Sequence, residues 1–157
     1  MINWHEHSRA EDRLERTEAL TKSLKAVHQA TRVVMDAESK LARQRAPKNV
    51  QAATTALVVA QEAKAAAQAA HTEALREMCE LHLDFSLDDI VEVCTKHGTL
   101  RQPIVVEDVE FCHRSDGRMY LRIQGLLLEE SESGRPPLRQ GFDVLEDDDT
   151  RWVVRLN

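Results

Sequence analysis

The stretch Asn49–Leu83, NVQAATTALVVAQEAKAAAQAAHTEALREMCELHL, decides the fold of this chain. It contains neither glycine nor proline, and strong helix formers, alanine above all, dominate it. We therefore expect one long helix over about residues 49–83. Asn49 is a favourable N-cap residue, and Pro47 disfavours a helical conformation at Ala46, so the helix is expected to begin there.

A second helix of similar length is predicted over about residues 9–45. Ser8 and Glu11 have the spacing of a capping box. Apolar and small residues then alternate at three- and four-residue intervals, which is typical of a coiled-coil seam, at Leu20, Leu24, Val27, Thr31, Val34 and Leu41. Because the break at residues 46–48 is short, the two helices should be antiparallel neighbours. Residues 1–84 are therefore predicted to form a helical hairpin.

The hairpin is expected to associate with further copies of itself. Alanine occupies many positions where leucine would bury more surface, and burial contributes only about 25 cal/mol per Å². Val33–Val34 and Leu57–Val59 are runs of consecutive apolar residues, so they cover more than one helix face. Extra apolar surface of this kind favours a homo-oligomer that forms through the helices.

A second module is predicted over residues 85–157, where the composition changes to Val, Leu, Asp and Gly. Ser86 and Asp89 have capping-box spacing, so we expect a short capped helix that ends at Gly98. The rest alternates like an antiparallel sheet of about four strands. The expected fold class is α+β, with a coiled-coil-like hairpin, a short helix and a small β-sheet.

The predicted strands cover residues 104–113, 119–128, 141–146 and 151–156. Turn residues at Ser115–Gly117 join the first two strands, and the last two strands are expected to pair as a hairpin. Gly125 interrupts the alternation of its strand and predicts a β-bulge. Residues 129–140 form a polar loop.

Composition and charge exclude several classes of protein. Of the net charge of −6, all lies in residues 85–157, where 9 basic residues face 15 acidic ones. A negative chain is unsuited to general nucleic-acid binding. The three cysteines are an odd number, which fits a reducing compartment. The first residues lack the pattern of a signal peptide, and the apolar runs are too short to cross a bilayer. We expect a soluble, cytoplasmic protein with no membrane contact.

Two Cys-x-x-His pairs are the candidate metal ligands. Cys79 with His82, and Cys94 with His97, could each offer one thiolate and one imidazole to zinc. The simpler interpretation makes both cysteines small buried apolar residues, and we favour that interpretation, with no cofactor. The acidic turn Glu146–Asp149 lacks the spaced ligands of a calcium loop and is interpreted as a solvated turn.

The hairpin tip is the candidate site for a partner. Its basic residues are Lys40, Arg43, Arg45 and Lys48, and no acidic residue occurs between Glu38 and Glu62. This pattern predicts a docking site for an acidic protein. The alternatives are a solvated patch that keeps the turn soluble, or nucleic-acid binding, for which the tip lacks interleaved aromatic residues.

No catalytic motif occurs in the sequence, so we expect a non-enzymatic interaction protein, of scaffold, adaptor or inhibitor type and of bacterial or phage kind. It would contact its partner through the basic tip or the acidic β module. One alternative is a regulator that uses the hairpin to probe a nucleic-acid enzyme. The layout is similar to that of Gre-type transcript-cleavage factors, although their hairpin tip is acidic. The other alternative is a ligand-binding protein or enzyme with a pocket between hairpin and sheet, lined by Cys94, His97 or His113.

Overall fold

The computed structural model describes residues 2–99, 103–128, 138–147 and 150–156. These residues form two compact units, and we describe each by itself. The hairpin unit is Leu14–Leu75, and the sheet unit is Met1–Arg13 together with Arg76–Asn157. Both long helices contribute residues to both units. The boundary that the composition places near residue 85 stays a prediction.

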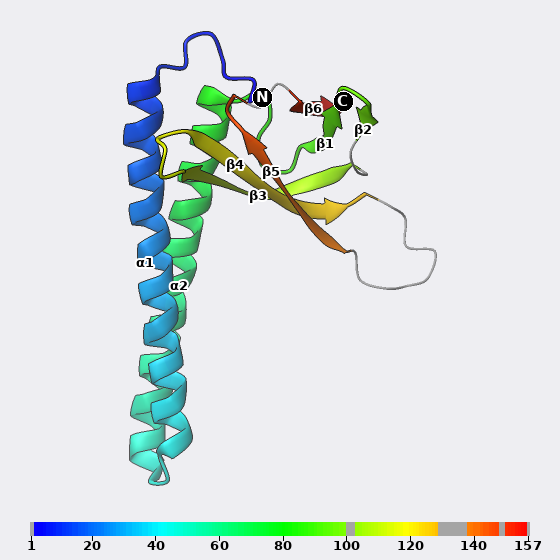
Figure 1. Cartoon of the computed structure of the whole chain (residues 1–157). Helices are drawn as coiled ribbons and strands as arrows, with labels where there is room; N and C mark the ends of the chain where they lie inside the picture. The colour runs from blue at the N-terminus through cyan, green and yellow to red at the C-terminus, as the bar shows by residue number, and fades with distance from the viewer. Residues whose placement is uncertain (1, 100–102, 129–137, 148–149, 157) are drawn as a thin grey trace. The chain divides into compact units, whose positions relative to one another are not determined.

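Two long helices form the predicted hairpin, α1 (Ala10–Arg43) and α2 (Pro47–His82) (Figure 1). The observed ends lie within two residues of the predicted ones. The cap of α2 differs from the expectation, because the Ala46 carbonyl accepts the amides of Asn49 and Val50, both at 3.0 Å. Pro47 is therefore the first helical residue, where its missing amide costs nothing.

The seam between the helices is lightly packed. Leu20 and Val34 are buried, whereas Leu24, Val27, Thr31 and Leu41 are only half-buried. A polar contact joins the helices, with 2.7 Å between Ser23 Oγ and His71 Nδ1. The single proton of the Ser23 hydroxyl goes to the Leu20 carbonyl at 2.8 Å. His71 therefore donates from Nδ1 to Ser23 Oγ.

The described residues of the sheet unit form six strands, two more than predicted, and the strands pair antiparallel. The strands are β1 (Ile90–Thr95), β2 (Gly98–Thr99), β3 (Ile104–His113), β4 (Met119–Leu127), β5 (Arg139–Leu145) and β6 (Arg151–Leu156). One edge of β1 pairs with β2 and β3, and the other edge pairs with β6. The order continues from β3 to β4 and β5. The turn at Ser115–Gly117 is confirmed between β3 and β4, where Gly117 has a φ of +84°.

The predicted short helix after Ser86 is wrong. Asp89 does accept the Ser86 amide at 2.7 Å, as the acid of a capping box would. However, Asp88 takes a φ of +70°, which turns the chain away from a right-handed helix. β1 begins at Ile90, and its branched residues pair with β3 and β6. Gly98 ends no helix, because it follows the tight turn after β1 with a φ of +118°.

The predicted hairpin between the last two strands is also wrong. β5 pairs with β4, from Leu126↔Arg139 to Tyr120↔Leu145. β6 pairs along the whole of β1, from Ile90↔Leu156 to Thr95↔Arg151. β5 and β6 are therefore neighbours in sequence that pair with different strands, β5 with β4 and β6 with β1. Residues 129–137 of the predicted polar loop, and 148–149 of the acidic turn, lie outside the described residues.

The predicted bulge lies opposite Gly125 and belongs to β3. Val106 pairs with Gly125 and Asp108 with Gln124, so Glu107 is the extra residue. Gly125 keeps the alternation of β4 and is itself buried. A Cβ atom added at Gly125 would lie 2.0 Å from the Val105 carbonyl oxygen. The glycine is therefore required because the two backbones approach closely at this point.

Glu146 ties the first residues of the chain to the sheet. Its Oε1 accepts Trp4 Nε1 at 3.2 Å and Arg13 Nη2 at 3.0 Å, and its Oε2 accepts the Met119 amide at 3.3 Å. The Arg13 guanidinium also lies 4.4 Å from the centre of the Trp4 ring. One partly buried carboxylate thus orders an indole, a guanidinium and a strand end.

We expect Gly125→Ala to lower the free energy of unfolding by about 2–3 kcal/mol, because its methyl group has no space against Val105. The matched control is Gly141→Ala in β5, where the nearest atom to an added Cβ is Gln124 Cγ at 3.5 Å, an ordinary contact. The measurement is denaturant unfolding followed by circular dichroism. Equal stabilities for the two variants would contradict this account of the bulge.

Candidate functional site

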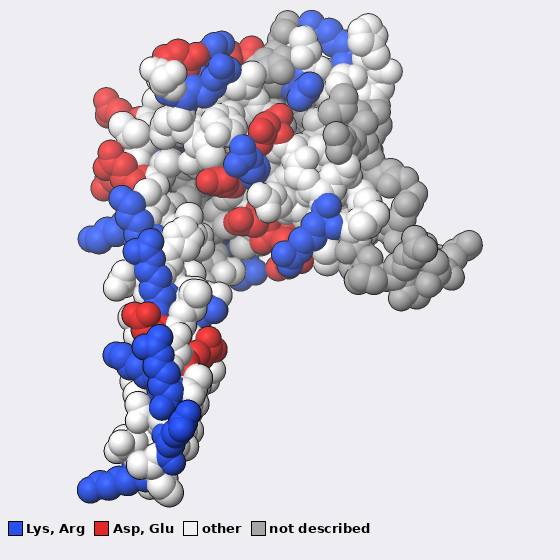
Figure 2. All heavy atoms as spheres, turned by 60° about the horizontal axis from the view of Figure 1, so that its bottom comes forward, with Lys and Arg blue, Asp and Glu red and all other residues white. Residues whose placement is uncertain are grey.

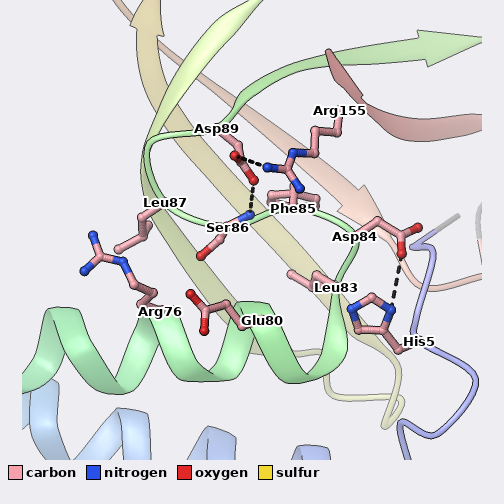
Figure 3. Close-up of a pocket in the computed structure, with 10 residues that line it drawn as sticks. All are labelled: His5, Arg76, Glu80, Leu83, Asp84, Phe85, Ser86, Leu87, Asp89 and Arg155. Carbon is pink, nitrogen blue, oxygen red and sulfur yellow. Dashed lines mark hydrogen bonds and ion pairs between the residues drawn. The ribbon is translucent and has the colours of Figure 1, made fainter. Parts of the chain in front are cut away.

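A cavity of about 440 Å³ lies within the sheet unit where α2 ends and the chain passes to β1 (Figure 3). His5 comes from the first segment, Arg76 and Glu80 from α2, and Arg155 from β6. The junction supplies the remaining lining residues: Leu83, Asp84, Phe85, Ser86, Leu87 and Asp89. The cavity therefore combines three apolar side chains with charges of both signs.

Two arginine–carboxylate ion pairs and one histidine–carboxylate contact lie at the rim of this cavity. Arg155 Nη2 lies 2.8 Å from Asp89 Oδ1, and Arg76 Nη2 lies 3.1 Å from Asp88 Oδ2. His5 Nδ1 lies 3.3 Å from Asp84 Oδ1. Asp89 also accepts the Ser86 amide, so its carboxylate joins β6 to the junction. Since most of these groups are well exposed, each pair contributes only about 0–1 kcal/mol.

Ser86 leaves one polar atom in the cavity without a partner. Its Oγ is buried and has no hydrogen bond among the described residues. Figure 3 shows the hydroxyl directed toward α2, on the side where Glu80 lies. A buried hydroxyl without a partner is costly, so this position favours a polar group from a ligand or an ordered water. No local sequence pattern predicts this cavity, because its residues come from three separate stretches of the chain, at residue 5, residues 76–89 and residue 155.

The four basic residues predicted at the tip do lie together. Lys40 and Arg43 are in the last turn of α1, Arg45 is in the connection, and Lys48 is in the first turn of α2. All four are exposed, and basic side chains gather along the hairpin toward the tip in Figure 2. The first turn of α2 contains no acidic residue, and a cation there is disfavoured by the helix dipole. Lys48 therefore does not serve the stability of its own helix.

One flank of the hairpin unit carries a groove of about 650 Å³. Val33 and Ala37 of α1 line one side of it. Its floor consists of four alanines of α2: Ala52, Ala53, Ala56 and Ala60. Lys40, Gln44 and Asn49 close it toward the tip. Several large apolar side chains of the hairpin are exposed, among them Val33 by 46%, Met35 by 60%, Val58 by 46% and Val59 by 59%.

The four candidate zinc ligands are placed differently from one another. Cys79 is fully buried in α2, and His82 Nδ1 lies 2.7 Å from Ser8 Oγ. Cys94 Sγ lies 3.5 Å from Glu92 Oε1 on β1, and His97 is exposed in the following turn. No three His, Cys, Asp or Glu side chains within the described ranges come together as a metal site. Burial raises the pKa of Cys79 to about 12, which disfavours the thiolate that zinc requires.

Two further groups bear on the sequence-based hypotheses. His113 lines a cavity of about 470 Å³ on the sheet, together with Tyr120, Asp143 and Arg151. In the acidic turn, the Glu146 carboxylate is occupied by Trp4 and Arg13, as described above. Asp147 Oδ2 lies 3.1 Å from Arg118 Nη1.

Comparison with protein families, curated proteins and solved structures finds no match for this chain. Among the described residues, neither long helix is apolar enough over a sufficient length to cross a bilayer.

We expect Cys79 to be unreactive toward a thiol reagent in the folded protein, because its thiol is buried and its pKa is raised. Cys94 and Cys112 are half-buried and should react. Native labelling with Ellman's reagent should therefore detect two thiols, and a third only after unfolding. Cys94→Ser and Cys112→Ser should each remove one native thiol from the count. Rapid native labelling of Cys79 would show that the end of α2 is open to solvent.

Proposed function

We propose that this chain is a non-enzymatic interaction protein that associates with itself through its hairpin and holds a protein partner through the basic tip. The observation that carries the proposal is the small amount of side-chain burial in the hairpin unit. Within Leu14–Leu75 the buried side chains are Thr17, Leu20, Val34, Ala60 and Leu75. Two helices of this length would be expected to bury a continuous seam of large apolar residues.

The exposed apolar residues of the hairpin support self-association. Complete burial of a valine or methionine side chain contributes about 1.5–3 kcal/mol. Val33, Met35, Val58 and Val59 remain about half exposed or more, so a second copy can gain stability by covering some of them. The groove beside Val33 offers a concave surface with an alanine floor, which a helix could approach closely.

The tip supports the partner contact. Four exposed cations lie within one turn of the connection between the helices, and Lys48 stands where its own helix disfavours a positive charge. An acidic surface on a partner would satisfy both features. The acidic β module remains the alternative partner-binding surface. Capture of an enzyme that acts on nucleic acids would favour the alternative in which the hairpin is a probe.

We expect the wild-type protein to have a mass above 17.8 kDa in light scattering after size exclusion, as a multiple of the chain mass. The variant Val33→Lys/Val59→Lys should move toward the monomer, because it places charges on the apolar flank. The matched control is Leu138→Lys, which changes a side chain that is 71% exposed in the sheet unit. A wild-type protein that stays monomeric at high micromolar concentration would contradict the self-association.

A second experiment tests the tip. We expect a pull-down from the native host to recover one partner with the wild-type protein and to lose it with Lys40, Arg43, Arg45 and Lys48 all changed to Glu. The control changes four basic residues of α1 that lie farther from the tip to Glu. These residues are also exposed: Arg16, Lys22, Lys25 and Arg32. A partner retained by the tip variant would move the contact to the β module.

A further inference from the structure

Small apolar residues recur at three- and four-residue intervals along one exposed face of α2, separate from the seam with α1. Its members are Ala52, Ala56, Val59, Ala63, Ala66 and Ala70, and all six are exposed. The face extends over about 27 Å at 1.5 Å per residue. Ala52 and Ala56 also line the groove shared with Val33 of α1, so the face borders this groove.

The positions on this face are symmetric about residue 61. Ala52 and Ala70 are equally distant from it, as are Ala56 and Ala66, and Val59 and Ala63. An antiparallel copy of the same helix would therefore place alanine against alanine at both ends. At the centre, the larger Val59 would meet the smaller Ala63 of the second copy. Small side chains at each position permit helix axes to approach to about 8 Å.

Charges at the two ends of the face have opposite sign. Lys48 continues the face toward the tip, and Glu77 continues it toward the end of α2, with Glu73 beside it. In an antiparallel pair centred on residue 61, Lys48 lies opposite position 74 of the second copy, between Glu73 and Glu77. In a parallel pair in register, Lys48 would face Lys48 and the two basic tips would lie together, which is repulsive.

We propose that α2 pairs with α2 of a second copy, antiparallel and about a two-fold axis near Gln61, so that Lys48 of each copy lies between Glu73 and Glu77 of the other. This rests on the proposed self-association and names its geometry. A two-fold interface of this kind closes on itself, so the assembly is a dimer. It also gives Lys48 the carboxylates that its position in α2 calls for.

Cysteine cross-linking tests the geometry. In a Cys94→Ser/Cys112→Ser background, Ala52→Cys and Ala70→Cys are made on separate chains and oxidised alone and after mixing. We expect a disulfide-linked dimer predominantly in the mixture, because position 52 lies against position 70. Cross-links of 52 to 52 and 70 to 70 would overturn the proposal in favour of a parallel pair.

The masses of the same samples keep the two proposals apart. If light scattering shows a dimer without a 52–70 cross-link, the antiparallel geometry is wrong and self-association stands. If the samples are monomeric with an intact helical spectrum, both proposals fail.

A charge exchange tests the end contacts without cysteines. We expect Lys48→Glu to weaken the dimer several-fold in sedimentation equilibrium, because a carboxylate would then face Glu77 of the second copy. Adding Glu77→Lys to the same chain should restore the wild-type dissociation constant. In a parallel pair, position 48 would face position 48 of the second copy, so two lysines or two glutamates would repel each other alike. An unchanged dissociation constant for Lys48→Glu would therefore overturn the proposal.

Discussion

The stability of the hairpin is limited by the small apolar surface that its two helices bury against each other. High helix propensity makes each helix easy to form, but propensity alone leaves isolated helices marginal in water. An alanine side chain contributes a single methyl group to a seam, and the seam of α1 buries only Leu20 and Val34 among its large residues. The long hairpin therefore requires other sources of stability. The end segments of both helices belong to the sheet unit, and the proposed second copy of the chain would cover some of the exposed apolar residues of the hairpin.

Carboxylates organise the sheet unit at two places where the chain changes direction. Asp89 accepts the Ser86 amide and pairs with Arg155, and this fixes the passage from α2 into β1 beside β6. Glu146 joins Trp4 and Arg13 to the end of β5. Both groups accept several hydrogen bonds while partly buried, a setting in which charge-assisted bonds are stronger than at a free surface. The first of these junctions, with Asp89 and Arg155, lines the cavity at the end of α2.

The helices and the tip could be predicted from sequence because their signals are local and long. Helical periodicity, a proline and a cluster of four cations need no knowledge of distant residues. The short helix was predicted wrongly because the Ser86–Asp89 bond serves a turn as well as a helix N-terminus. The choice was made by Ile90 and Val91 pairing with Val105 and Ile104, which a local pattern does not contain. The same limit applies to β6, whose partner β1 lies about 60 residues earlier, and to the cavity near Ser86.

The distribution of burial along α2 has a consequence for how the molecule opens. Met78 and Cys79 are almost completely buried, whereas every residue from Pro47 to Val59 is exposed or half-buried. The free energy of local opening depends on such differences in burial. It ranges from near zero at frayed helix ends to the free energy of global unfolding in a core. Amide hydrogen exchange should therefore change by orders of magnitude along one continuous helix, fast near the tip and slow near the sheet. A molecule that binds the tip would slow amide hydrogen exchange there, and exchange in the core would stay unchanged.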